Sequence, residues 1–128
     1  MKRSGIERAR PAAIAIALAA AWVAAFPVPA GALTVSPQDC REGADFIGNA
    51  ARSRDNGMPA ARFIARLDED LVLIQSFAPE LRWFARDDDD ARLLRSATVR
   101  VFEEPALPEL HGESFLSECM ALVLRAER

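Results

Sequence analysis

The sequence predicts an all-α fold: a small bundle of four main helices, held by one disulfide and preceded by a signal peptide. Three observations predict it. Apolar residues recur at three- and four-residue steps along most of the chain, as on one side of an amphipathic helix. Residues that start or stop helices separate these stretches. Two cysteines, Cys40 and Cys119, lie near the two ends of the helical part.

Residues 1–32 are predicted to be a secretory signal peptide. A basic start is followed by a stretch without charge, whose centre reads AAIAIALAAAWVAAF. Ala30-Gly31-Ala32 then places small residues where a signal peptidase cuts, so cleavage is expected after Ala32. The alternative is a retained membrane anchor, since the uncharged stretch is long enough to reach across a bilayer. Its high alanine content, together with Pro27 and Pro29 at its end, favours cleavage.

Residues 33–128 are predicted to form a single helical domain, located in the periplasm or secreted. This part has 12 arginines, no lysine and 18 acidic residues, which gives a formal charge of −6. An acidic domain without a basic stripe is a poor candidate for binding nucleic acid or anionic lipid. After cleavage of the signal peptide, no stable attachment to the membrane is expected.

The cysteine pair predicts one intramolecular disulfide, Cys40–Cys119, because export places both thiols in an oxidising compartment. The two residues are too far apart for a redox C-x-x-C motif. Closing a loop of this length stabilises a domain by roughly 4–5 kcal/mol in the chain-entropy model.

The first predicted helix begins at Ser36-Pro37, because serine suits the N-cap and proline the first helical position. It ends at Asn56-Gly57, where glycine accepts a left-handed conformation. The apolar side of this helix consists of Cys40, Ala44, Ile47 and Ala51.

The second predicted helix starts near Pro59 and is stopped by Pro79. Near its end the polar side disappears, since the sequence LVLI at residues 71–74 is apolar all round. A helix end of this kind is expected to be covered on several sides, which makes this the central helix of the predicted bundle. Its apolar side consists of Ala60, Phe63, Ile64, Leu67, Leu71 and Ile74.

The third predicted helix runs from the aspartates at 87–90 to about Phe102. Before it, Trp83 and Phe84 are expected to plug the edge of the core from a short turn of helix. Residues 98–102 also alternate like a strand, but helix is favoured because no partner strand is visible elsewhere. After a loop at 103–108, the last helix is expected from Glu109 or Ser114 to Ala126.

The four consecutive aspartates, Asp87 to Asp90, are interpreted as the start of a helix. Consecutive side chains on a helix point about 100° apart, so four in a row cannot converge on one ion. A calcium loop would need alternating ligands and a glycine at its sharp turn. Aspartate is instead a strong N-cap, and negative charge suits the first helical turn. A calcium site and a negative patch for a partner are the alternatives.

His111 is the only histidine, and it is expected in an exposed or capping position. A catalytic arrangement with Ser114 or Ser117 is not excluded by composition, but the glycines of a nucleophile elbow are absent. A zinc site would need His111 together with both cysteines, for which a disulfide is the better use. No catalytic, cofactor-binding or metal-binding residues are therefore assigned, and no cofactor is expected.

Several segments together resemble small exported bacterial helical proteins of uncharacterised function, in which two cysteines lie near the ends of the mature chain. These segments are ARSRDNGM after the first cysteine, then ELRWF, VFEEP, and FLSEC with the second cysteine. The resemblance covers most of residues 33–128. It implies export from a bacterium and carries over no functional residue.

The function expected from these observations is a non-enzymatic one, as an accessory, inhibitor or protein-binding protein acting on another envelope protein. Small size, an acidic surface and the lack of a catalytic motif favour it. A small-ligand or metal-binding module is the first alternative, and a hydrolytic enzyme is the second.

Overall fold

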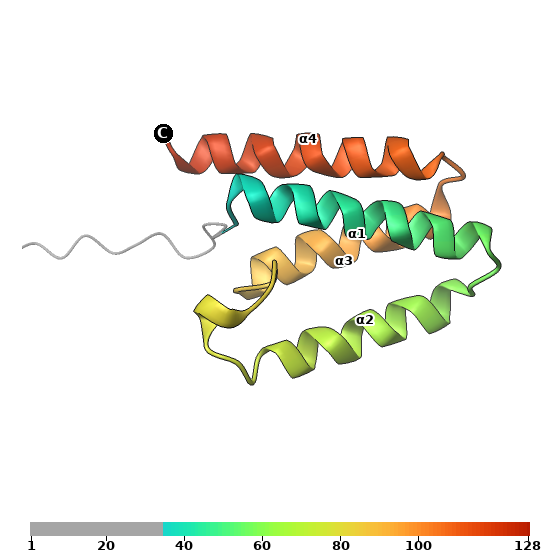
Figure 1. Cartoon of the computed structure of the whole chain (residues 1–128), viewed down its shortest axis with the longest axis horizontal. Helices are drawn as coiled ribbons and strands as arrows, with labels where there is room; N and C mark the ends of the chain where they lie inside the picture. The colour runs from blue at the N-terminus through green and yellow to red at the C-terminus, as the bar shows by residue number, and fades with distance from the viewer. Residues whose placement is uncertain (1–34) are drawn as a thin grey trace, which may run out of the picture.

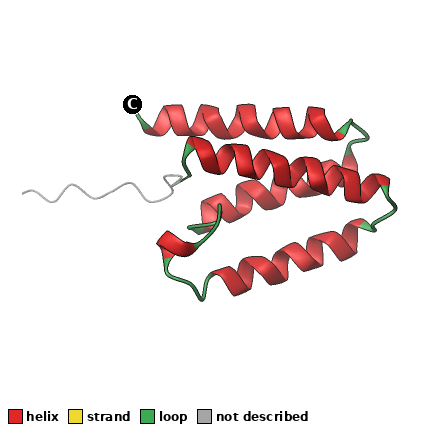
Figure 2. Cartoon of the chain, in the orientation of Figure 1, coloured by secondary structure: helices red, strands yellow, loops and turns green. Residues whose placement is uncertain are grey.

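The computed structural model describes residues 35–128, so the predicted signal peptide lies outside the described part. Four α-helices and one short 3₁₀ helix make up this part, which contains no strand (Figure 2). The elements are α1 (Pro37–Asp55), α2 (Ala60–Ile74), η1 (Pro79–Leu81), α3 (Asp88–Glu103) and α4 (Pro108–Ala126). The predicted all-α class with four main helices is confirmed, and residues 98–102 are helical.

Helix α1 begins and ends where the sequence predicts. The Ser36 hydroxyl accepts a hydrogen bond from the Asp39 backbone N–H, and the Asp39 carboxylate accepts one from the Ser36 backbone N–H. This reciprocal pair is a capping box, which satisfies two backbone donors that the helix leaves free. At the other end, Gly57 has a φ of +92°, a conformation that glycine adopts without strain.

Two other helix boundaries differ slightly from the prediction. Helix α4 begins at Pro108, one residue before the earlier of the two expected starts. Proline fits there because the first helical position needs no backbone donor. Helix α2 ends at Ile74, so Pro79 does not stop it and instead opens η1.

The prediction that the second helix is central is wrong. Each helix runs antiparallel to the one before it, and α1 lies between α4 and α3, while α2 packs against α3 at the outer edge (Figure 1). Small residues let α1 and α4 pack closely. A Cβ at Gly112 of α4 would lie 3.1 Å from the carbonyl oxygen of Ala44, which is tighter than ordinary contact, whereas one at Gly48 would make ordinary contact, 3.6 Å from that of Pro108. The two backbones therefore approach closely.

Helix α2 is correspondingly exposed. Leu67 is its only buried residue, whereas Val72 and Leu73 are 68% and 64% exposed. The apolar segment that predicted a covered helix end is thus on the surface of the described part of the chain.

A row of aromatic rings crosses the core. Neighbouring ring centres lie 5.5–5.9 Å apart, in tilted arrangements. Tilted pairs are favourable because ring edges and faces carry opposite partial charge. In order, the rings are those of Phe102, Phe63, Phe46, Trp83, Phe84 and Phe115. The predicted aromatic plug is confirmed for Phe84, which is fully buried, while Trp83 is partly exposed.

The predicted disulfide is confirmed. Cys40 of α1 and Cys119 of α4 are bonded, with their Cα atoms 5.6 Å apart, and both are fully buried. The bond joins the beginning of the first helix to the last part of the fourth. Because both thiols are used, neither is available for the zinc site considered from the sequence.

Candidate functional site

The aspartates at 87–90 form the start of α3, as predicted. Asp87 is the N-cap, and its carboxylate accepts a hydrogen bond of 2.9 Å from the Asp90 backbone N–H. Asp89 forms an ion pair with Arg92 on the same helix. Asp90 points inward and accepts a hydrogen bond from the Arg86 backbone N–H. Three of the four carboxylates thus serve different partners, and residues 35–128 contain no group of three His, Cys, Asp or Glu side chains placed to hold a metal ion.

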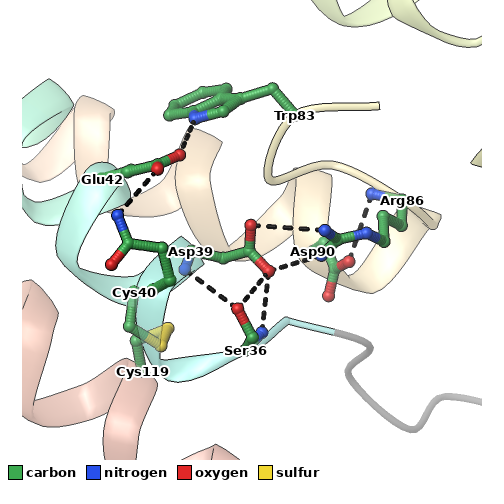
Figure 3. Close-up of polar contacts among 9 residues, drawn as sticks. Ser36, Asp39, Cys40, Glu42, Trp83, Arg86, Asp90 and Cys119 are labelled. Atoms are coloured by element: carbon green, nitrogen blue, oxygen red, sulfur yellow. Dashed lines mark hydrogen bonds and ion pairs between the residues drawn. A yellow bond between two sulfur atoms is a disulfide. The ribbon is translucent and has the colours of Figure 1, made fainter. Parts of the chain in front are cut away.

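Asp39 and Arg86 connect α1 to the segment before α3 (Figure 3). The Arg86 guanidinium donates to both oxygens of the buried Asp39 carboxylate, at 2.5 and 3.4 Å. Burial alone would raise the pKa of Asp39, but the hydrogen bonds from Arg86 and Ser36 outweigh it and hold this pKa below its usual value. The same contact raises the pKa of Arg86. Both groups are therefore charged at neutral pH.

The indole of Trp83 adds a second tie to α1, since its Nε1 donates to the Glu42 carboxylate at 2.9 Å (Figure 3). Between Trp83 and Arg86, Phe84 has a φ of +23°, an unfavourable conformation for a residue with a side chain. These ties and the burial of the Phe84 ring hold that conformation in place. The Asp39–Arg86 network therefore fixes the backbone of this segment. The Asp39 carboxylate is fully occupied by its donors, Ser36 and Arg86.

His111 is buried, with 7% of its surface exposed, so the expectation of an exposed position is wrong. Its Nε2 lies 3.0 Å from the carbonyl oxygen of Glu104, which is the C-cap of α3. With the proton on Nε2, the imidazole donates to this carbonyl, in line with the capping alternative. Ser114 and Ser117 are exposed, and neither forms a hydrogen bond with His111 in the described structure.

Arg54 fixes the turn between α3 and α4. Its guanidinium donates to the carbonyl oxygens of Val101 and Glu104 through Nη1, at 2.7 and 2.9 Å, and to that of Ala106 through Nη2, at 2.7 Å. The planar guanidinium suits this task because its donors lie in a fixed geometry. A side chain from the end of α1 thus holds the backbone of a turn about 50 residues later.

This fixed turn carries exposed apolar side chains. Leu107, the N-cap of α4, is 65% exposed, and Leu110 in the first turn of the helix is 54% exposed. Four exposed glutamates lie within four residues of one of these leucines. We call this group the turn surface; it consists of Glu103, Glu104, Leu107, Glu109, Leu110 and Glu113. Only Glu109 among these acids has an ion-pair partner in the described part, Arg52 at 3.6 Å.

No family model, curated protein or solved structure matches this chain. The candidate site is therefore argued from the residues alone, and the turn surface is the part of the molecule that the sequence did not single out. The segment EEPALPEL does contain a signal that points to this surface. Its two leucines stand among acids and prolines, and this mixture does not fit the regular apolar spacing of an amphipathic helix. The role of Arg54 had no such signal, because its partners are backbone atoms.

None of the helices in residues 35–128 combines the length and the apolar character that crossing a membrane requires.

Proposed function

We propose that this protein is an exported, non-enzymatic binding protein of the bacterial envelope, which acts as an accessory or inhibitor on another envelope protein. The observation that carries the proposal is the turn surface, with two exposed leucines among acidic side chains on a backbone fixed by Arg54. The confirmed disulfide is compatible with export, because such bonds persist in oxidising compartments.

The chemistry of the turn surface defines the partner. Leu107 and Leu110 can fill an apolar socket, which would remove their surface from water at about 25 cal/mol per Å². The surrounding glutamates favour arginine or lysine at the rim of that socket, which speeds association and selects the partner by charge.

The fixed backbone makes this surface suited to binding. A loop that is ordered before binding loses little conformational freedom on association, so more of the contact energy appears as affinity. Arg54 and His111 supply that order here, since together they bond the carbonyl groups of the turn.

Site-specific photo-crosslinking in cells tests the proposal. A photoreactive side chain at position 110 is expected to join the protein to one envelope protein, whereas the same group at the exposed position 125, at the far end of α4, is not. Binding of the purified partner is then measured by calorimetry, where Leu107→Ser and Leu110→Ser should each weaken affinity by about tenfold, or roughly 1.4 kcal/mol. Added salt should slow association, because exposed charges are screened.

Two outcomes would refute the proposal. One is equal crosslinking from positions 110 and 125, which would mean that contact is not confined to the turn surface. The other is a partner whose affinity is unchanged in both serine variants.

A further inference from the structure

Helix α2 presents an outward side that the rest of residues 35–128 does not cover. We call it the α2 face; it consists of Arg62, Ala65, Glu69, Val72 and Leu73. In Figure 1, α2 lies at one edge of the bundle, with only one side turned toward α3. The two apolar residues lie together at the end of the helix and are both more than 60% exposed. Contiguous apolar surface on a helix marks a place where something packs.

The opposite end of the same helix is hollowed. A surface hollow of about 550 Å³ lies beside the start of α2. Its lining consists of Met58, Arg62, Phe63, Ala65, Arg66 and Glu69. One helix therefore carries projecting apolar side chains at its end and a partly apolar hollow at its beginning.

The two charged side chains of the α2 face also lack a partner within residues 35–128. Arg62 and Glu69 are exposed and have opposite charge, and the side chain of neither forms a hydrogen bond or ion pair within residues 35–128. Their neighbours do have partners. Arg66 pairs with Asp70 at 3.3 Å, and Asp68 pairs with Arg95 of α3 at 2.8 Å. Arg62 and Glu69 are seven residues apart, which is two helical turns, so they lie on the same side of α2.

These features fit a second copy of the chain, and we propose that two copies dock through their α2 faces, with the helices antiparallel about a two-fold axis. In such an arrangement Arg62 of each copy lies opposite Glu69 of the other, which forms two ion pairs. These pairs form when the two-fold axis passes each helix between Ala65 and Arg66.

The same register also joins the apolar end to the hollow. Leu73 lies one helical turn beyond Glu69, so in this register it extends past Arg62 of the other copy toward the start of that copy's α2, where the hollow lies. Ala65 lies beside the axis, where a small side chain allows the two helices to approach closely. The register that pairs the charges thus also brings the apolar end of each helix to the hollow of the other.

The α2 face is complementary to itself, and for this reason we propose a second copy of the chain as its partner and not another protein. Two-fold interfaces use the same patch on both subunits, so each feature must meet its complement within that patch. Here an exposed arginine and an exposed glutamate lie on the same side of one helix, so each can meet the other across a two-fold axis. The α2 face is separate from the turn surface, so this proposal does not depend on the proposed function.

Sedimentation velocity on the oxidised protein, purified after export of the full chain, tests the proposal over a concentration series. The protein should change from monomer to dimer as concentration rises, and added salt should weaken the dimer. Glu69→Arg and Arg62→Glu should each weaken dimerisation by at least about tenfold, because each places like charges opposite one another. The double variant Arg62→Glu/Glu69→Arg restores opposite charges and should recover the dimer.

Glu127→Arg is the matched control, since it makes the same change of charge at an exposed position beyond α4, and it should leave dimerisation unchanged. Leu73→Ser should weaken the dimer without changing its salt dependence. Circular dichroism and thermal unfolding of each variant establish that the fold is retained.

A wild-type protein that stays monomeric at every concentration would overturn the proposal. A dimer that both single charge variants leave intact would overturn the alignment, as would a double variant that fails to recover what the single variants lose.

Discussion

Gly43 shows how a missing side chain shapes the core at the scale of one residue. It lies in α1 beneath two aromatic rings, where a Cβ would be 2.6 Å from Cε1 of Phe115 and 3.0 Å from Cε2 of Phe84. No Cβ fits at the first of these distances. The two rings therefore occupy the space that a larger residue would need, where α1, α4 and the segment before α3 meet.

Replacing Gly43 by alanine should destabilise the protein by about 1–3 kcal/mol, the usual cost of overfilling a packed core. Gly48→Ala is the matched control in the same helix. The nearest atoms to its added methyl group would be 3.6 Å away, which is ordinary contact, and alanine favours a helix over glycine by roughly 1 kcal/mol. Gly48→Ala should therefore be neutral or stabilising. Urea unfolding measures both, and equal effects of the two substitutions would contradict this account of Gly43.

Sequence patterns predict individual residues when the decisive interaction is local. The Ser36 cap, the Asp87 cap and the Gly57 turn depend on residues within a few positions, and all three are confirmed. His111 and Arg54 depend on backbone carbonyls of a distant turn. Every residue type has a backbone carbonyl, so the residues at those positions do not indicate the contact. Neither role could therefore be predicted from the sequence.

The aspartate-rich start of α3 carries a prediction at the scale of one element. Asp87→Ala removes the side-chain acceptor for the Asp90 backbone N–H, and it should lower the free energy of unfolding by about 0.5–2 kcal/mol. Asp87→Ser keeps a capping oxygen and should lose less. Asp88→Ala removes only a favourable charge near the helix dipole, with an effect of about 0.3–1 kcal/mol. Calcium should leave the melting temperature unchanged, and a calcium-dependent rise that Asp87→Ala abolishes would restore the metal interpretation.

The tie between α1 and the segment before α3 depends on pH through Asp39. Its pKa is lower in the folded protein than the ordinary value of 3.8, so its stabilising contribution is full above that value and is lost as the pH falls through the folded pKa. Asp39→Asn removes the charge at every pH. It should therefore destabilise the protein by about 1–3 kcal/mol near neutral pH, where Arg86 loses its charged acceptor.

The difference between the wild type and Asp39→Asn should shrink in acid, because protonation removes the same charge from the wild type. Denaturant unfolding at pH values from about 7 down to about 2.5 measures it. Asp45→Asn, at an exposed position of the same helix, is the control and should show little effect at any pH. A difference that stays constant into acid would mean that the Asp39 charge is not what stabilises the contact.

Helix α2 shows what periodicity leaves open at the same scale. The apolar sequence at residues 71–74 predicts a covered helix end, but in the described residues Val72 and Leu73 are exposed, because periodicity does not say whether the chain itself covers an apolar surface. Which helix becomes central depends on how closely the backbones can approach. Small residues contribute to this on the side of α4, where Gly43 of α1 lies against the Phe115 ring and Gly112 of α4 lies against the Ala44 backbone.

At the scale of the whole molecule, the order of the helices places the two ends of the described chain together. Four antiparallel helices in sequence bring the start of α1 beside the end of α4 (Figure 1). The sequence predicted this pairing through its cysteines, since both lie on the apolar sides of their helices. The two cysteines lie 79 residues apart along the chain, so the loop that their bond closes includes nearly all the elements that must fold.

Loss of this bond should lower stability more than any substitution considered above. Removing a native disulfide from a small secreted domain costs about 2–5 kcal/mol, because the unfolded chain regains the freedom that the bond had taken away. The double variant Cys40→Ala/Cys119→Ala should therefore unfold at lower denaturant concentration than the oxidised protein. Alanine is chosen because both sites are fully buried, and a serine hydroxyl would add the separate cost of burying a polar group.

The reduced wild-type protein is the comparison that separates the bond from the side chains. Reduction keeps both sulfur atoms in the core and removes only the constraint, so its unfolding midpoint should lie between those of the oxidised protein and the alanine variant. Mass spectrometry with and without alkylation verifies the oxidation state of each sample. If oxidised and reduced proteins unfold at the same midpoint, the contacts between α1 and α4 alone hold the two ends of the chain together.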